Sequence, residues 1–251
     1  MAKQGGIIKL EGTIGDISFY KTRDGMLARA KGGVTSGRIQ NDASFQRTRE
    51  NMSEFGRAGT AGKLLRTAFR QLLQNGADNR MVSRLTKEML AVVKADKTST
   101  RGQRNVLDGE LKLLEGFDFN IDGGLSTTVF FAYTATIDRV TGALKVTIPA
   151  FIPTETVVAP DGATHMRLIS GGASIDFEGG VVEIVTTQSA DIVIDQVQVA
   201  AFDLLNQLTA NSTKPLFLVF GVEFYQQVNG VNYSLKNGNY NALSLVKVLG
   251  L

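Results

Sequence analysis

The sequence predicts an α+β protein with an N-terminal β-hairpin arm, a basic helical segment of two to three helices and a C-terminal antiparallel β-sandwich. Three observations support this prediction. Residues 7–34 alternate partly, as short strands do, and apolar residues recur at helical spacing over residues 44–115. After them, short β-type runs are separated by regular turn signals. The expected parts are residues 1–40, 41–116 and 117–251.

The N-terminal part is expected to contain too little β-structure to be stable alone. Its strands are Ile7–Glu11, Ile14–Lys21 and Met26–Ala30, and Arg23-Asp24-Gly25 is a hairpin turn signal. These strands must add either to the C-terminal sheet of the same chain or to the sheet of another subunit. The linker Lys31–Ile39 contains three glycines and is expected to be an extended, mobile arm.

The first helix is expected to begin after a cap at Asp42 or Ser44, whose short side chains satisfy free N–H groups of the first turn. It contains Gly56, Gly59 and Gly62 at every third position, and each costs about 1 kcal/mol relative to alanine in a helix interior. Two alternatives remain open. The helix is either broken near Gly59, or it presents a bare face to a closely approaching backbone.

A second helix is expected after a cap at Asp78 or Asn79. Its predicted buried face consists of five apolar residues, namely Met81, Leu85, Met89, Val92 and Val93. The spacing of Thr100 and Gln103 is that of a capping box and predicts a third helix, which ends near Gly116.

The C-terminal part is rich in Val, Ile, Thr and Phe, and many short strands with regular turns are typical of a sandwich or barrel. The expected strands are Ser126–Ile137, Ala143–Ile148, His165–Ser170, Val181–Thr187, Ile192–Ala201, Leu216–Gln227, Val231–Leu235 and Leu243–Leu249. Asn229-Gly230 predicts a two-residue type I′ hairpin, and Gly171-Gly172 predicts a turn. Phe202–Leu208 is expected to be a helical turn or a connection between sheets.

The net charge of +3 conceals an asymmetry between the two halves of the chain. Residues 1–116 contain 21 Lys and Arg against 12 Asp and Glu, a balance of +9; residues 117–251 contain 6 against 12, a balance of −6. Three interpretations remain open: an ordinary solvated helix surface, attraction between the basic and acidic parts of neighbouring copies, or nucleic-acid binding by the basic part.

The sequence lacks the side-chain patterns of common enzymes. It contains no cysteine and a single histidine, His165, so neither a zinc site nor a serine hydrolase triad is indicated. The carboxylate pairs Asp176/Glu178 and Asp191/Asp195 are of a kind common on sheet surfaces. We therefore expect no enzyme, no cofactor and no metal site.

The apolar runs are short. None approaches the eighteen residues of a membrane span, and the run that follows residue 6 is too short and too charged for a signal peptide. We therefore expect synthesis in the cytoplasm without a signal peptide, and presence outside the cell only in a virion or another released assembly.

Two stretches resemble a group of Bacteroidota proteins of the domain-of-unknown-function type. These are Gly12-Thr13-Ile14-Gly15-Asp16-Ile17-Ser18-Phe19-Tyr20-Lys21 and Phe45-Gln46-Arg47-Thr48-Arg49-Glu50-Asn51. The resemblance implies a glycine-rich β segment, a basic helix and a C-terminal β domain, together with a bacterial or bacteriophage origin. It implies no activity and no functional residues.

The leading hypothesis is a non-enzymatic structural subunit that assembles with copies of itself into a filament, tube or virion component. The expected subunit interface consists of apolar arm residues, namely Ile7, Ile8, Leu10, Ile14, Ile17, Phe19 and Tyr20. The alternative is a nucleic-acid-binding protein. Its expected phosphate contacts are Arg47, Arg49, Arg57, Lys63, Arg66, Arg70, Arg80 and Arg84.

Overall fold

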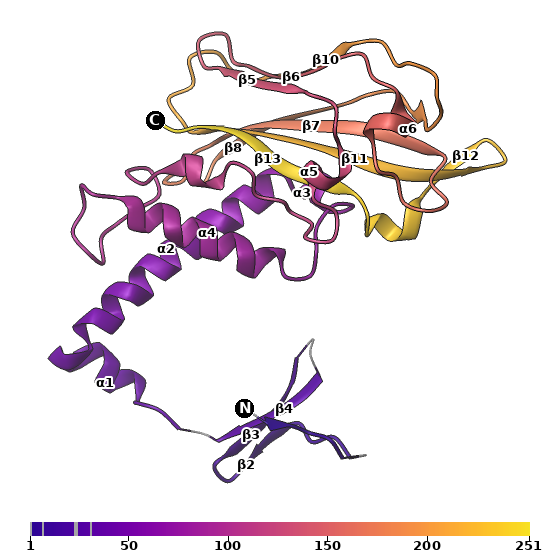
Figure 1. Cartoon of the computed structure of the whole chain (residues 1–251). Helices are drawn as coiled ribbons and strands as arrows, with labels where there is room; N and C mark the ends of the chain where they lie inside the picture. The colour runs from indigo at the N-terminus through magenta and orange to yellow at the C-terminus, as the bar shows by residue number, and fades with distance from the viewer. Residues whose placement is uncertain (1, 7, 23–24, 31) are drawn as a thin grey trace. The chain divides into compact units, whose positions relative to one another are not determined.

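The computed structural model describes residues 2–6, 8–22, 25–30 and 32–251. It contains both helices and antiparallel sheets, with helices in the middle of the chain and a curled C-terminal sheet (Figure 1). Its internal contacts divide the chain into two compact units, Met1–Arg49 and Glu50–Leu251.

The first unit contains a four-stranded antiparallel sheet in the order β1-β4-β3-β2. Its strands are β1 (Ala2–Lys3), β2 (Gly12–Ile14), β3 (Ile17–Thr22) and β4 (Gly25–Ala30). The expected first strand is not formed, because residues 8–11 lie outside any strand. Ile7, Arg23 and Asp24 lie outside the described residues.

Helical structure begins earlier than the sequence predicts. Helix α1 (Ser36–Asn41) occupies part of the expected extended linker, and its end is supported by an ion pair between Arg38 and Asp42 at 3.2 Å. The carboxylate of Asp42 accepts the backbone N–H and the hydroxyl of Ser44 at 2.9 and 2.7 Å. Asp42 therefore caps the 3₁₀ turn η1 (Ala43–Phe45), which leads into the next helix.

Helix α2 (Gln46–Ala68) runs unbroken through its three glycines, so the alternative of a break near Gly59 is wrong. No other backbone of the described chain packs closely against these glycines either. A Cβ atom at Gly56 or Gly59 would meet nothing within 4 Å, and one at Gly62 would only touch the side chain of Leu85 at 3.8 Å. Helix α2 tolerates these residues because its buried side packs in the core, which outweighs their low helix propensity.

Helices α3 (Arg70–Leu73) and α4 (Met81–Ala95) follow. The five predicted core residues of α4 are all buried, which confirms its face. The predicted third helix is not formed: residues 96–110 are turns and loop, followed by the 3₁₀ turn η2 (Leu111–Leu114). The carboxylate of Asp96 explains this loop, because it accepts the backbone N–H groups of Thr98, Ser99 and Asn105 at 2.8, 2.9 and 3.1 Å.

The C-terminal part contains a six-stranded antiparallel sheet. The order along its main path is β12-β11-β7-β8, with β13 paired to β11 and β9 to β7. The strands are β7 (His165–Ile175), β8 (Val182–Gln188), β9 (Ile192–Val193), β11 (Leu216–Val228), β12 (Val231–Ser234) and β13 (Ala242–Leu249). Asn229 and Gly230 both have positive φ angles, 52° and 78°, which confirms the predicted turn between β11 and β12.

A second antiparallel sheet consists of β10 (Phe202–Gln207), β6 (Ala143–Ile148) and β5 (Thr134–Asp138). Strand β10 replaces the predicted helical turn or connection between sheets, because Leu204 and Asn206 alternate inward and pair with β6. The expected strand Ser126–Ile137 is formed only at its end, in β5. Its beginning lies in the short helix α5 (Leu125–Thr128). Two further short elements are α6 (Pro153–Thr156) and η3 (Leu235–Gly238).

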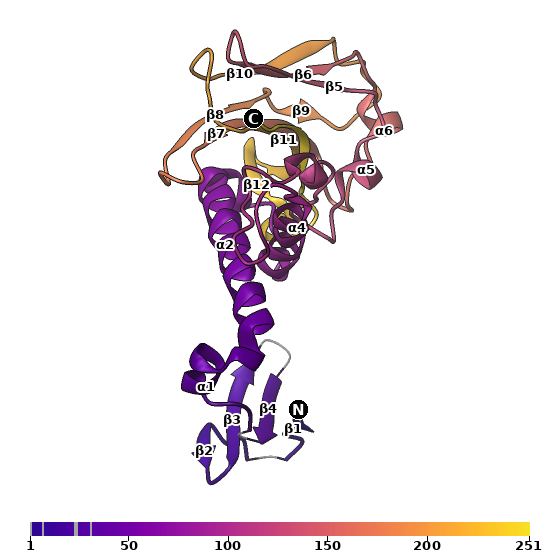
Figure 2. The ribbon, with the colours of Figure 1, turned by 90° about the vertical axis from the view of Figure 1, so that its left-hand side faces the viewer.

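The six-stranded sheet is covered on both faces. The helices pack on one face, where Leu65 of α2 and Leu85 of α4 share a buried cluster with Phe217 of β11. The three-stranded sheet covers the other face, where Leu144 of β6 is buried with Phe220 of β11. Figure 2 shows these three layers one above the other.

Gly171 and Gly172 lie inside β7 rather than in the predicted turn, because each faces one of the covering layers. A Cβ at Gly171 would lie 2.8 Å from Leu72 on the helix side. A Cβ at Gly172 would lie 2.9 Å from Cβ of Asn206, which belongs to the three-stranded sheet. The two glycines therefore allow the helices and the small sheet to approach the same strand from opposite sides.

Candidate functional site

The N-terminal sheet has one mainly apolar face and one mainly polar face. Directly opposed residues of neighbouring strands share a face, and residues two apart on a strand also share it. The register pairs Ile17 with Ile14 on one side and with Ala30 on the other, and it pairs Phe19 with Ala28. These apolar residues therefore lie on one face, together with Lys21 and its partner Met26.

The opposite face of this sheet is mainly polar, although Leu27, the partner of Tyr20, also lies on it. Thr13 is paired with Ser18, and their hydroxyl groups are 3.3 Å apart. Arg29 stands over the ring of Tyr20, with its guanidinium carbon 5.5 Å from the ring centroid. Tyr20 therefore does not belong to the apolar face, although the sequence grouped it with the interface residues.

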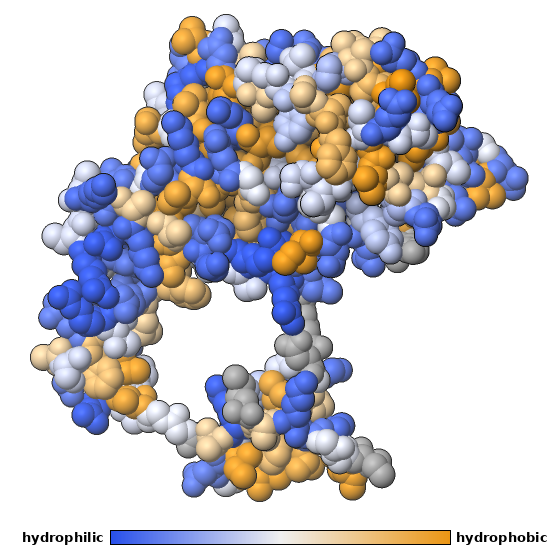
Figure 3. Space-filling view, in the orientation of Figure 1, coloured by the Kyte–Doolittle hydropathy of each residue, from blue (hydrophilic) through white to orange (hydrophobic). Residues whose placement is uncertain are grey.

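The apolar face is not buried within its own unit. None of the described residues between 2 and 49 is buried, and Ile14 and Ile17 are 62% and 45% exposed. Ile8 and Leu10, which precede β2, are 81% and 41% exposed. Figure 3 shows apolar surface on this small sheet. Most folded sheets bury one face against another layer, so this unit lacks the second layer that such a face requires.

The structure adds Met26, Ala28 and Ala30 of β4 to the predicted interface residues Ile14, Ile17 and Phe19. The alternation of Met26, Ala28 and Ala30 was visible in the sequence, but only the register places it beside β3. Ile7 lies outside the described residues, and Ile8 and Leu10 are outside the strands.

Three members of the predicted basic patch make hydrogen bonds within the chain itself. Arg49 donates from Nη1 to the carbonyls of Ile39 and Asp42 at 2.7 and 2.9 Å. Arg84 donates from Nη1 to the carbonyl of Asp118 at 2.8 Å and pairs with Asp78. These bonds hold the guanidinium groups on the protein and leave them less available to an external phosphate.

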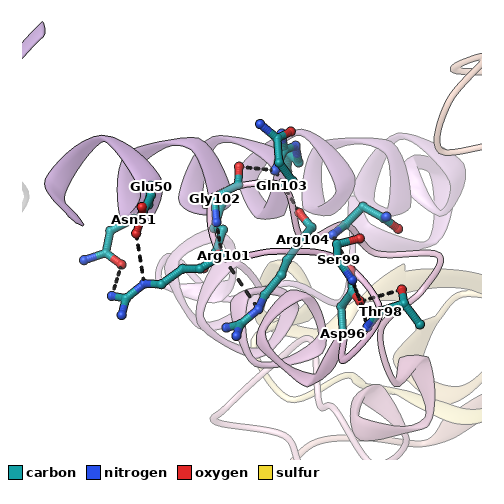
Figure 4. A network of polar contacts seen from close by, with 12 residues as sticks. Glu50, Asn51, Asp96, Thr98, Ser99, Arg101, Gly102, Gln103 and Arg104 are labelled. Atoms are coloured by element: carbon teal, nitrogen blue, oxygen red, sulfur yellow. Dashed lines mark hydrogen bonds and ion pairs between the residues drawn. The ribbon is translucent and has the colours of Figure 1, made fainter. Parts of the chain in front are cut away.

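Arg57 is the third of these residues and holds the loop after α4. Its Nη1 donates to the carbonyls of Gly102 and Arg104 at 2.7 and 2.9 Å, and its Nη2 donates to Gln103 at 3.0 Å. Figure 4 shows the loop lying along α2, with Arg101 directed toward Glu50 and Asn51. The contacts fix residues 96–105 against the helix.

The remaining predicted phosphate contacts differ in their surroundings. Lys63 and Arg70 are exposed, and Arg66 is half-buried between them in the sequence. Their spacing of three and four residues places them near one another along the end of α2 and the start of α3. Arg47 and Arg80 each have a contact within the protein.

The carboxylates that the sequence singled out have structural roles. Asp176 accepts the N–H groups of Glu178 and Gly179 at 3.1 and 2.9 Å and pairs with Lys214 at 2.8 Å. The N–H of Gly179 and the Lys214 ammonium hold the pKa of Asp176 below its ordinary value. Asp191 receives two hydrogen bonds from Arg167 at 2.8 and 2.5 Å.

His165 begins β7, where its Nδ1 lies 2.9 Å from the hydroxyl of Thr164. Within the described part of the chain, no three or more His, Cys, Asp or Glu side chains are grouped so as to hold a metal ion. Among those same residues, no helix is both long enough and apolar enough to span a bilayer.

Comparison of the chain with protein-family models, with curated proteins and with solved structures finds no match. The resemblance of two stretches to a Bacteroidota family therefore stays a prediction.

Proposed function

We propose that this protein is a structural subunit that associates with further copies of itself through the apolar face of its N-terminal sheet. The observation that supports this proposal is the sheet itself, which has one mainly apolar and one mainly polar face and no buried residue among those described up to residue 49. A second copy offers the same surface, so two such faces can bury each other's isoleucine and phenylalanine side chains.

The short edge strands of this sheet limit association by strand addition. Its outer strands β1 and β2 are only two and three residues long, so they offer few backbone groups for strand addition. Contact between two copies of one face is self-complementary and closes a pair, whereas addition of strands head to tail builds an open filament. Both contacts together would build a filament, tube or virion component from pairs.

The proposal includes two interpretations of the architecture. Residues 1–40 act as an arm, and the two C-terminal sheets form an antiparallel β-sandwich that carries the particle's body. The second interpretation is supported by the buried cluster whose residues come from both sheets, including Val146 and Leu204 on one side and Leu218 and Val222 on the other.

A pair of double variants tests the proposal on the full chain. Ile14→Lys with Ile17→Lys places two charges on the apolar face, and Thr13→Lys with Ser18→Lys adds the same charges to the polar face of the same two strands. Burial of an isoleucine contributes about 1.5–3 kcal/mol, so the first variant should weaken association by about a hundredfold or more. Light scattering as a function of concentration measures the change.

The control variant should associate within a few fold of the original chain. A monodisperse monomer at every concentration, or equal association of both variants, would contradict the proposal. Circular dichroism of each variant confirms that its secondary structure is retained.

Deleting residues 1–34 distinguishes assembly from packing within one chain. The two buried clusters of the described chain begin at Ala58 and at Leu125, so the rest of the protein keeps its core after the deletion. We expect a smaller, folded and soluble monomer. An insoluble chain would mean that the N-terminal sheet covers its own subunit instead.

The alternative function, nucleic-acid binding, has a smaller basis than the sequence predicts. It depends on the exposed side chains of Lys63 and Arg70, with Arg66 between them. Gel shifts with double- and single-stranded DNA and RNA at low salt test it. Retardation that disappears as salt rises, and that is lost in Lys63→Glu with Arg70→Glu, would support this function.

A further inference from the structure

The helix-covered face of the six-stranded sheet changes from apolar to polar along β11. Val219, Glu223 and Tyr225 lie on the same face, because their positions differ by even numbers. Val219 is buried among the helices, whereas Glu223 and Tyr225 carry polar groups on a face that is otherwise part of the core. Arg167 on β7 lies directly opposite Glu223.

A cavity of about 440 Å³ lies where this polar end of the sheet meets the end of helix α3. Its floor includes Arg167, Glu223 and Tyr225, and its helix side includes Gln71, Gln74 and Asn75. The volume is within the range of about 300–1,000 Å³ that small-molecule sites occupy.

Glu223 is the central group of this cavity. It is only 8% exposed, yet the groups that donate to its carboxylate are neutral: Tyr225 at 2.5 Å and Asn75 at 3.3 Å. Burial of a carboxylate without a paired cation is costly, and its two oxygens have about four acceptor positions in total. Two of these positions therefore remain for a donor from a ligand.

Tyr225 stays a hydrogen-bond donor at neutral pH. Its own burial and the neighbouring Glu223 carboxylate raise the pKa of its phenol. The guanidinium of Arg167 stands over the ring, 5.1 Å from the centroid, and is itself bound to Asp191 at 2.8 and 2.5 Å. Asp191 therefore balances the charge of Arg167, and the same guanidinium places a positive group beside Glu223 in the cavity.

Gln71, Gln74 and Asn75 add three carboxamides along the helix side. A carboxamide presents a carbonyl acceptor next to an N–H₂ donor, which matches two adjacent hydroxyl groups. A free cation would be repelled by the positive charge of Arg167, and an anion would be repelled by the negative charge of Glu223. A neutral ligand with several hydroxyl groups avoids both conflicts and satisfies the free acceptor positions of Glu223.

We propose that this cavity binds a neutral saccharide, with Glu223 accepting from its hydroxyl groups and the carboxamides of Gln71 and Gln74 bonding at the helix side. This site is independent of the N-terminal sheet, so its test is separate from that of the self-association proposed above.

Titration of the full chain with glucose, galactose, N-acetylglucosamine, maltose and cellobiose tests the proposal, with saturation-transfer NMR or calorimetry as the readout. Gln71→Ala with Gln74→Ala removes two exposed carboxamides without touching the buried Glu223. Loss of a hydrogen bond costs about 1 kcal/mol, so this double variant should bind about tenfold or more weakly. The matched control is Gln226→Ala, an exposed glutamine of β11 one residue beyond Tyr225 on the opposite face.

The expected result is millimolar or tighter binding of at least one of these sugars, weakened in the double variant and changed less than about twofold in Gln226→Ala. Glu223→Gln provides a second variant and should weaken binding while the thermal unfolding curve shows that the protein is folded. Absence of binding by all five sugars, or equal affinity in the double variant and the control, would overturn the proposal. Binding of putrescine in their place would assign the cavity to cations and would overturn it as well.

Discussion

The carboxylate of Glu54 accepts the backbone N–H of Gly102 at 2.8 Å, across 48 residues of sequence. Glu54 is 2% exposed, and the same oxygen lies 4.0 Å from Nε of Arg104. That Nε is buried without a hydrogen-bond acceptor among the described residues. One side chain of α2 therefore supports a loop backbone and lies beside the half-buried side chain of Arg104.

Glu54→Ala should destabilise the protein by about 1–3 kcal/mol, because it leaves the buried N–H of Gly102 without its acceptor and removes the carboxylate beside Arg104. Glu54→Gln keeps the carbonyl oxygen and should cost less. Urea unfolding at neutral pH measures both free energies, with Glu178→Ala as the exposed control. If Glu54→Ala unfolds at the same urea concentration as the control, the contact contributes nothing to stability.

Asp96 makes the stability of the same loop depend on pH. Burial acts to raise the pKa of its carboxyl, but the N–H groups of Ser99, Asn105 and Thr98 outweigh burial and hold the pKa well below its ordinary value. Because the unfolded-state pKa is about 3.9 and the folded-state pKa is lower, the contribution is complete above about pH 5. It is lost as pH falls through the folded pKa.

We therefore expect Asp96→Asn to be less stable than the original chain at neutral pH, and the difference between the two free energies of unfolding to shrink steadily as pH falls below about 4. Urea unfolding at several pH values measures this convergence. Asp161→Asn, at an exposed turn position, should follow the original chain throughout. A constant difference between Asp96→Asn and the original chain at all pH values would show that the carboxylate charge is not responsible.

Two glycine-to-alanine changes should have opposite effects on stability. At Gly172 a Cβ would lie 2.9 Å from Cβ of Asn206 and 3.2 Å from Cβ of Leu144, neither of which is the free end of a flexible side chain. Gly172→Ala should therefore cost about 1–3 kcal/mol. At Gly59 a Cβ meets nothing within 4 Å, so Gly59→Ala should stabilise α2 by about 0.5–1 kcal/mol.

Thermal and urea unfolding of both variants measure these effects. A neutral Gly172→Ala would mean that the two sheets separate easily at this point. A destabilising Gly59→Ala would mean that something packs against this side of α2 in solution.

Local periodicity predicted the elements that depend on local information. The buried face of α4 follows from apolar spacing alone, and the hairpin at Asn229 and Gly230 follows from the φ angles that its turn type requires. Gly171-Gly172 has the same composition as a turn, and only the layers on either side of β7 show why it is in a strand. Residues 202–207 contain two adjacent leucines, which hide the alternation of β10.

The candidate sites show the same division. The sequence placed Ile14, Ile17 and Phe19 together because they are close along the chain. It could not show that Arg57 bonds to a loop 45 residues away, and it therefore counted this side chain as a free charge. The polar cavity was missed altogether, because Gln74 and Glu223 are brought together only by the packing of α3 on the sheet.

The charge asymmetry of the chain leads to the last prediction. If the N-terminal apolar face drives self-association, high salt should weaken it only partly, because screening at about 1 M salt shortens the Debye length to about 3 Å but leaves apolar contacts intact.

A triple reversal of exposed or half-exposed charges, Lys63→Glu with Arg66→Glu and Arg70→Glu, tests attraction between basic and acidic parts. It avoids Arg49 and Arg57, whose hydrogen bonds hold the chain itself. We expect the triple variant to fold and to associate more weakly than the original chain at low salt, and to approach it at high salt, as measured by light scattering. Equal association of the two proteins at every salt concentration would mean that these charges are ordinary solvated surface.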